Sequence, residues 1–231
     1  MYLSFTPRFL QNMFSDLVWR IDKPEADIYL TFDDGPIPEV TPWVLDTLDE
    51  YHAKATFFCV GQNVERYPNI FNKVTERGHA IGNHTYNHLS GWNSENLDYI
   101  LNVRKGAIAS GSQLFRPPYG RLRLSQTRYL KHHYKIVMWD VLSGDFDPKL
   151  SAEACYQNVI KNTRQGSIIV FHDSLKSAKK LHTVLPRVLE YFTIQGFNFK
   201  ALDPMELHQA SGQMVYEEMT AESSTSSLLG H

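Results

Sequence analysis

Short apolar runs in this chain end repeatedly in residues that can carry out chemistry. Five runs close on an Asp-Asp pair, an Asn-His pair, an arginine, a lone aspartate and a His-Asp pair, at residues 29–34, 80–84, 114–116, 136–140 and 168–173. Side chains that follow parallel strands gather at one edge of a sheet or barrel, where α/β enzymes build their active sites. The five junctions therefore predict one reactive pocket on an α/β fold.

Strand-like and helix-like segments alternate along the chain, which predicts parallel strands joined by helical crossovers. The predicted strands span residues 27–32, 55–60, 79–82, 113–115, 134–141, 167–171 and 197–201. The predicted helices span residues 42–51, 68–77, 94–109, 124–132, 152–163 and 178–191. About seven strands suit either a barrel or an open doubly wound sheet, and the pattern alone leaves both open.

Size and charge favour one large domain, which we place at residues 25–210. The 231 residues carry a formal net charge of -2, which argues against nucleic acid as a partner. No run of about 18 apolar residues is present, so no transmembrane segment is predicted. No signal peptide is recognised, which favours the cytoplasm by default and leaves association with the cell envelope open. The oligomeric state is not indicated.

The two ends of the chain differ from the predicted domain. Residues 1–24 carry apolar side chains at helical spacing, including Phe9, Met13 and Leu17, which predicts an amphipathic helix packed on the domain. Residues 211–231 are rich in Ser, Thr and Glu, which predicts a flexible tail.

The first two junctions have the composition of a catalytic metal site. His84 and His88 are four residues apart, so on one face of a helical turn both imidazoles can reach one cation. Asp34 is the natural third ligand, and its neighbour Asp33 points another way and can accept a proton. Two histidines and one carboxylate leave positions open for water and substrate. Taken singly, the Asp-Asp turn is more often a plain polar turn, and an isolated histidine pair is as often structural as ligating.

Two later junctions supply a buried cation and a candidate acid. Arg116 opens the run Arg-Pro-Pro-Tyr-Gly, whose prolines stiffen the loop, so it can hold the arginine against a carboxylate and aim a backbone N–H into the site. His172 ends a strand of four apolar residues at the same predicted edge, which favours an acid role. The plainer alternatives are a rigid connection with a surface arginine and a core histidine.

Together these motifs resemble those of the polysaccharide deacetylase family, the NodB-homology domain of carbohydrate esterase family four. Thr-Phe-Asp-Asp-Gly-Pro, His-Thr-x-x-His, Arg-Pro-Pro-Tyr-Gly and a strand ending in histidine occur in the family's order at compatible spacing, within residues 27–201. Each motif is weak alone, and their conjunction is highly specific. The resemblance implies a distorted (β/α) barrel of about seven parallel strands, which decides between the two architectures.

The resemblance also implies a metal-dependent hydrolase that removes N-acetyl groups from N-acetylglucosamine-type glycans, chitin oligomers or peptidoglycan-like polymers, and releases acetate. It implies one divalent metal, zinc before cobalt, manganese, nickel or iron. The ligands it implies are Asp34, His84 and His88. The partner it implies is an N-acetylated glycan.

Further roles follow from the same resemblance. It implies Asp33 as general base and His172 as general acid. Arg116 would hold Asp33 in place, and the backbone N–H of Tyr119 would face the developing oxyanion.

One motif departs from the family's Asp-x-x-Asp-Trp pattern and reads Leu-Ser-Gly-Asp-Phe at residues 142–146. Asp145 matches the second aspartate, so the resemblance assigns it to orient His172. Leu142 replaces the first aspartate, and Phe146 replaces the tryptophan that would shape the acetyl pocket. Val170 stands where the family usually has leucine in that pocket.

Two other functions remain open. A metal-dependent amidase acting on a small non-sugar amide would use the same ligands, and a catalytically weak carbohydrate-binding relative would keep the scaffold. Aromatic side chains on predicted rim loops, such as Tyr86 and Trp92, favour a sugar ring. Asp140 and Asp173 are predicted to lie beside the site without a primary role.

Overall fold

The computed structural model describes residues 3–205 and 207. The chain divides into two units, residues 1–201 and 202–231. Helices α1–α8 and strands β1–β8 all lie in the first unit. The predicted domain end at residue 210 and the predicted tail over 211–231 lie outside the described residues.

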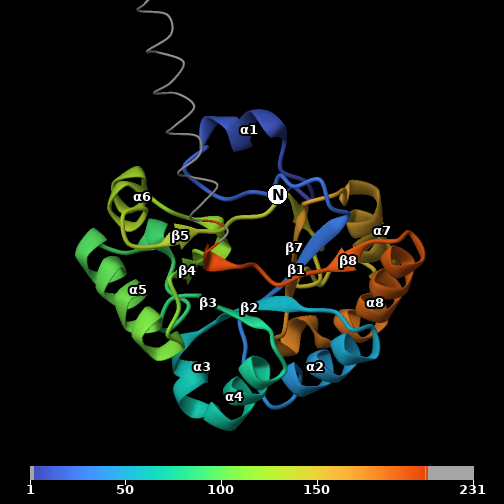
Figure 1. Ribbon diagram of the computed structural model, residues 1–231. Coiled ribbons are helices and arrows are strands. Elements are labelled where there is room, and N and C mark those ends of the chain that lie inside the picture. The colour runs from blue at the N-terminus through green and yellow to red at the C-terminus, as the bar shows by residue number, and fades with distance from the viewer. Residues whose placement is uncertain (1–2, 206, 208–231) are drawn as a thin grey trace, which may run out of the picture. The chain divides into compact units, whose positions relative to one another are not determined.

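Within the described residues, eight parallel strands form one sheet. Their order is β5-β4-β3-β2-β1-β7-β6, and β8 pairs with the start of β1 (Figure 1). The strands are β1 (Asp27–Asp33), β2 (Ala55–Cys59), β3 (Ala80–Asn83), β4 (Leu114–Phe115), β5 (Lys135–Ile136), β6 (Val141–Leu142), β7 (Ile168–His172) and β8 (Asn198–Phe199).

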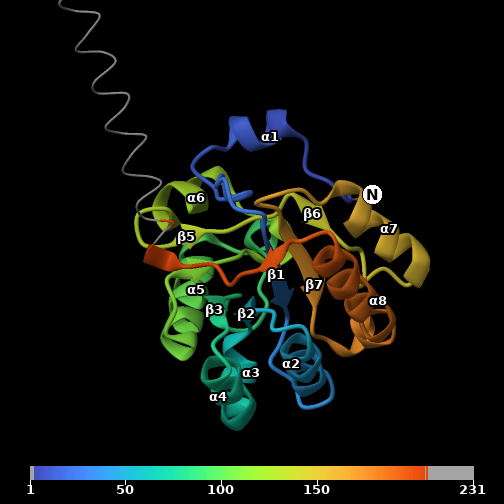
Figure 2. The same ribbon diagram turned by 45° about the vertical axis from the view of Figure 1, so that its right-hand side comes forward.

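Helices surround this sheet on its outer side, as Figures 1 and 2 show. They are α1 (Arg8–Met13), α2 (Thr41–Glu50), α3 (Gly61–Arg66), α4 (Pro68–Glu76), α5 (Asn96–Ser110), α6 (Leu124–Leu130), α7 (Ala152–Asn162) and α8 (Leu175–Ile194). The curled parallel sheet within a ring of helices confirms the predicted distorted (β/α) barrel. In the part of the chain that is described, every helix is too short or too polar to cross a membrane.

The central strand β1 is buried along its whole length because it has strands on both sides and helices over one face. Ile28, Leu30 and Phe32 belong to the main hydrophobic core, which also includes side chains of α2, α7 and α8. Side chains alternate along a strand, so Thr31 and Asp33 face the other way, into the barrel. The alternation therefore places the Asp33 carboxylate inside the barrel, at the carboxyl end of β1.

The N-terminal segment bonds to both open edges of the sheet. Val18 pairs with Val137 beyond β5, and Phe5 pairs with Val141 of β6. Of the apolar residues in the pattern predicted for residues 1–24, Leu17 packs against a buried cluster that includes Phe115 and Ile136. Helix α1 has six residues, with Phe9 and Met13 exposed and Gln11 buried. Extended backbone on either side of the helix, together with the packing of Leu17, attaches the segment.

The predicted strand at 134–141 is wrong, because it divides into β5 and β6 at opposite edges of the sheet. Between them, the carbonyl oxygens of Val137 and Met138 accept hydrogen bonds from Arg116 instead of pairing with a further strand. Asp140 consequently precedes β6, and its carboxylate accepts hydrogen bonds from Ile168 N and Ser167 Oγ at the start of β7. It lies at the opposite end of β7 from His172, which corrects its predicted place beside the site.

Candidate active site

Three predicted metal ligands lie together at the carboxyl ends of β1 and β3. Asp34 follows β1, and its Oδ1 lies 3.1 Å from His88 Nε2 and 3.8 Å from His84 Nε2. The three donor atoms all lie within 4.8 Å of one another. Metal bonds to imidazole nitrogen and carboxylate oxygen are about 2.0–2.2 Å long, so donors around one ion can be separated by such distances. This group, called the triad below, can therefore share one cation.

The chemistry of the triad fits a divalent metal. Asp34 Oδ1 is buried and, among the described residues, has no hydrogen-bond partner. Burial on its own would raise the pKa of Asp34, but nearby His88, His172 and His84 hold it below its ordinary value. An ionised, buried oxygen without a donor is costly unless a cation satisfies it.

His84 is prepared as a neutral ligand. Its Nδ1–H donates to the carbonyl oxygen of Arg116 at 2.8 Å, which leaves Nε2 as the lone-pair donor toward Asp34. Burial lowers the pKa of His84 to about 4. The imidazole is therefore uncharged at neutral pH, as metal ligation requires.

The backbone around the triad is unusual. The residues from Thr85 to His88 form a turn, and Thr85 and His88 have φ values of 64° and 59°. The predicted helical placement of the histidine pair is therefore wrong, and a tight turn brings the rings together instead. Asp34 (φ 84°) and Tyr119 (φ 61°) are also in the left-handed region. Such conformations in non-glycine residues are sparsely populated and cluster at functional sites.

Asp33, the adjacent carboxylate, is held by a fully buried arginine. Arg116 Nη1 donates to Asp33 Oδ1 at 2.8 Å and to Thr31 Oγ1 at 2.6 Å. Its Nε and Nη2 donate to the carbonyl oxygens of Val137 and Met138. In the described part of the chain no residue donates to Asp33 Oδ2, so that oxygen can accept a proton.

The guanidinium of Arg116 also rests on an aromatic ring. Its central carbon lies 4.0 Å from the centroid of the Phe58 ring. Gly82 on the neighbouring strand leaves room for that ring, because a Cβ there would be 2.3 Å from Phe58 Cδ1. Glycine, phenylalanine and arginine from three strands thus position the Asp33 carboxylate. Sequence reasoning missed Phe58 and Gly82, although period-two alternation places both on the inner face of the sheet.

His172 is paired with a second buried carboxylate. Its Nδ1 donates to Asp145 Oδ1 at 2.7 Å, and its backbone N–H donates to Asp145 Oδ2 at 2.7 Å. Burial on its own would lower the pKa of His172, but the charge and hydrogen bond of Asp145, with smaller contributions from Asp34 and Asp33, raise it to about 9. His172 is therefore protonated at neutral pH and able to donate a proton.

The predicted substrate-binding residues lie at different depths. The Tyr119 side chain is exposed, and its ring packs edge-on against His88 at 4.8 Å between centroids. The Phe146 ring packs edge-on against His172 at 5.1 Å. Val170 is buried in β7, two residues before His172 and therefore on the same face of the strand.

Further residues complete the surroundings of Asp34. The Asp173 carboxylate accepts hydrogen bonds from Gly35 N and Thr41 Oγ1, and so fixes the turn after Asp34. Lys176 Nζ lies 3.5 Å from Asp34 Oδ2. Asp173 was predicted nearby, whereas no motif in the sequence indicated Lys176.

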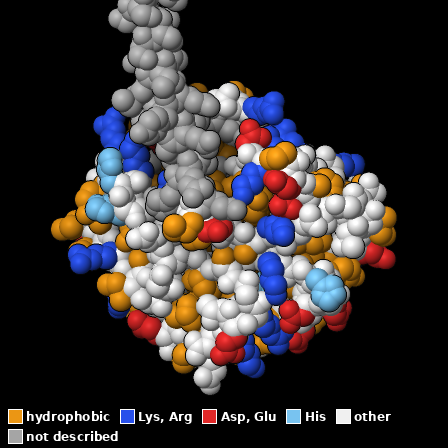
Figure 3. Space-filling model, in the orientation of Figure 1, with side chains coloured by type: hydrophobic (Ala, Val, Ile, Leu, Met, Phe, Trp, Pro, Cys, Tyr) orange, Lys and Arg blue, Asp and Glu red, His pale blue; other side chains and the backbone are white. Residues whose placement is uncertain are grey.

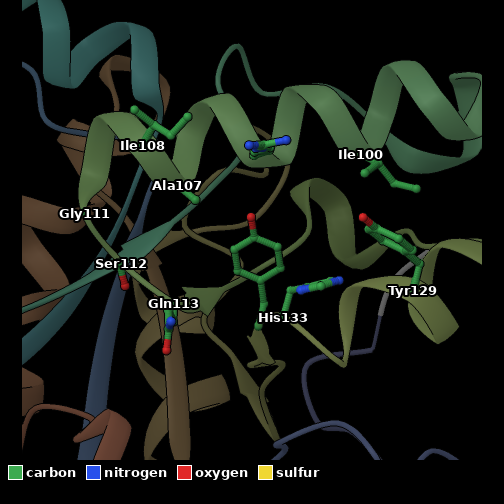
Figure 4. Close-up of a pocket in the computed structure, with 10 residues that line it drawn as sticks. Ile100, Ala107, Ile108, Gly111, Ser112, Gln113, Tyr129 and His133 are labelled. Atoms are coloured by element: carbon green, nitrogen blue, oxygen red, sulfur yellow. The ribbon is translucent and has the colours of Figure 1, made fainter.

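The surface of the described residues has a hollow away from the predicted site and a mixed distribution of charge. A hollow of about 380 Å³ lies between α5 and α6, where Ile100, Tyr129 and His133 are among the lining residues (Figure 4). It contains none of the predicted site residues. Acidic and basic side chains are interspersed over the described part of the face shown in Figure 3.

Comparison with known proteins places this arrangement in a family. The polysaccharide deacetylase family matches residues 20–137. A peptidoglycan-N-acetylglucosamine deacetylase from Bacillus cereus is 37% identical over 193 residues, covering 79% of this chain and 89% of the relative. A chitooligosaccharide deacetylase from Azorhizobium caulinodans is 37% identical over 166 residues, covering 67% of this chain and 77% of the relative.

A solved structure supports the same family. The crystal structure of the Bc1960 peptidoglycan N-acetylglucosamine deacetylase, in complex with an N-hydroxybenzamide, superposes with a TM-score of 0.71 at 30% identity, covering 86% of this chain and 95% of the other. The chain therefore belongs to the polysaccharide deacetylase family and to its class of enzymes, the carbohydrate deacetylases.

Proposed function

We propose that this protein removes N-acetyl groups from N-acetylglucosamine residues of a glycan and releases acetate, using one divalent metal. The observation that carries the proposal is the placement of Asp33 and His172 beside the triad, each held by its own buried partner. The named relatives, which act on peptidoglycan and on chitooligosaccharides, support the amino-sugar substrate.

Asp34, His84 and His88 would hold the metal, and zinc suits two imidazoles and one carboxylate. When bound, a divalent metal supplies Lewis-acid polarisation of the amide carbonyl and makes water more acidic. The buried, unpartnered Asp34 Oδ1 supports this assignment.

Asp33 acts as the general base. Arg116 occupies its Oδ1, so Oδ2 takes the proton from the attacking water. Because Arg116 is locked by four acceptors, the carboxylate keeps its position when it becomes neutral.

His172 acts as the general acid. Its Nδ1–H is committed to Asp145, so the Nε2 proton goes to the amide nitrogen as the C–N bond breaks. The free amine of the sugar and acetate are the products.

Three residues shape the substrate site. The Tyr119 backbone N–H faces the oxyanion of the tetrahedral intermediate, and its positive φ supports a specialised backbone position. Phe146 and Val170 border the acetyl methyl group, since the Phe146 ring contacts His172 and Val170 shares a face of β7 with His172.

An acetate-release assay with three substrates tests the proposal: N-acetylchitopentaose, peptidoglycan fragments and a simple acetamide. We expect release from the amino-sugar polymers, loss of release after chelation, and recovery when zinc is restored. Elemental analysis should find about one metal ion per chain. Release from the simple acetamide alone would contradict the glycan assignment, and full activity without metal would contradict the triad's role.

A further inference from the structure

A basic pocket opens beside the reacting centre. It is a hollow of about 400 Å³ between the first turns of α7 and α8, and three lysines line it, Lys176, Lys179 and Lys180. Ser151 and Thr183 add hydroxyl groups, and none of the described residues that line it is acidic. We call this hollow the lysine pocket.

The lysine pocket and the triad share a residue. Lys176 lines the pocket, and its Nζ lies 3.5 Å from Asp34 Oδ2. The same Nζ lies 5.9 Å from the centroid of the Phe146 ring, which contacts His172. A glycan unit seated at the triad would therefore place its neighbouring unit within reach of the pocket.

Among the described residues, a carboxylate pairs with one of the three lysines, Lys176, and the charges of Lys179 and Lys180 are not neutralised. Lys180 Nζ donates to the backbone carbonyls of Asp145, at 3.0 Å, and of Asp147. These acceptors carry no net charge, so they orient the ammonium group without neutralising it. Within residues 3–205 and 207, neither Lys179 nor Lys180 has a carboxylate within 4.0 Å. Lys176 pairs with Asp34, whose charge a bound metal would share.

We propose that the lysine pocket binds a carboxylate carried by the glycan next to the N-acetylated sugar, so that the enzyme prefers anionic glycans to neutral ones. Three like charges around one hollow repel one another, and a bound carboxylate would relieve that repulsion. The Ser151 hydroxyl, which accepts from Ala154 N, can donate to its oxygens. The inference rests on the proposed function for the adjacent site.

The test is a binding comparison on the chelator-treated full chain, independent of turnover. The ligands are N-acetylchitopentaose carrying one O-carboxymethyl group and its neutral O-hydroxyethyl counterpart, titrated by calorimetry. We expect the carboxymethyl form to bind about fivefold tighter at 50 mM NaCl, with the preference falling below about twofold at 500 mM, because exposed ion pairs are weak and screened by salt.

Variants locate the preference. Lys179 is exposed, so Lys179→Gln should fold normally and reduce the preference about two- to threefold. The matched control Lys161→Gln removes an exposed lysine at the other end of α7 and should keep the preference. Equal binding of the two oligomers, or an undiminished preference in Lys179→Gln, overturns the proposal. Acetate release measured separately distinguishes the two claims: preference without release counts against the proposed function alone, and release without preference counts against the pocket alone.

Discussion

The two halves of the active site are built differently. On one side, Asp33 is bonded to Arg116 and His172 is bonded to Asp145, with each partner fully buried. On the other side, the triad brings three donor atoms together but leaves Asp34 Oδ1 buried without a hydrogen bond from any described residue. The side chains that we propose for proton transfer, called the proton-transfer half, are satisfied by the protein itself, whereas the triad leaves a buried oxygen that a cation could satisfy. The two halves should therefore respond differently to mutation.

The largest effect is expected from the triad. His84→Ala removes the ligand whose tautomer is fixed by the Arg116 carbonyl, so bound metal should fall from about one per chain to near zero. Acetate release should fall by at least about a thousandfold, because Lewis-acid stabilisation is worth several kcal/mol. Elemental analysis and the acetate assay measure both quantities. His132→Ala, at an exposed position outside the site, is the control. Full metal content in His84→Ala would refute the ligand assignment.

Asp33→Asn should impair proton transfer without removing the metal. The amide oxygen can still accept from Arg116 but cannot take a proton, so kcat should fall about 100- to 10,000-fold while metal content is kept. A thermal melt with the same metal analysis checks that the fold is intact. Near-normal turnover would show that another group is the base, and loss of the metal would show that the halves are not independent.

The sequence predicted some parts of the fold and of the site correctly and others wrongly. The ends of β1, β3, β4 and β7 were predictable because apolar runs stop at polar or charged residues, and parallel strands place their ends at one edge. Asp140 was misplaced because the apolar run at 136–139 hides a break between β5 and β6. A hydrophobic pattern records burial and not the partner of each strand.

The sequence pattern also did not predict local backbone geometry or contacts between distant elements. His84 and His88 have the spacing of a helix, yet positive φ at Thr85 and His88 forms a turn. Lys176 reaches Asp34 because α8 follows β7, which pairs with β1, and the local sequence does not contain that pairing. In α1, six residues are too few for an amphipathic face to determine packing, and Gln11 is buried through its bond to the Thr6 carbonyl.

The pH response should depend on Asp145. The pKa of His172 is about 9 in the folded protein, above its ordinary value of 6.5, so its pairing stabilises the fold fully below about pH 6.5 and loses this contribution as the pH rises through about 9. In Asp145→Asn the largest raising contribution disappears. The pKa of His172 should drop by at least about one unit, and activity at pH 10, above both pKa values, should drop about tenfold.

An NMR titration of the His172 ring in metal-free protein, alongside the pH profile of kcat/KM, measures this shift. A bound cation would itself lower the pKa of His172, so the unmodified protein and Asp145→Asn must be compared in the same metal state. An unchanged alkaline limb in Asp145→Asn would argue that His172 is not the acid.

The smallest effect is expected at Gly82, which lies against the Phe58 ring that supports Arg116. Gly82→Ala would place a Cβ 2.3 Å from Phe58 Cδ1, so the ring that supports Arg116 must move. We expect a loss of about 1–3 kcal/mol in the free energy of unfolding, a fall of a fewfold in kcat, and unchanged metal content. Adding Phe58→Leu to this variant relieves the clash but removes the aromatic surface under the guanidinium. Denaturant melts should then recover part of the stability while kcat stays low, whereas recovery of both would mean that the ring only fills space and does not position Asp33 through Arg116.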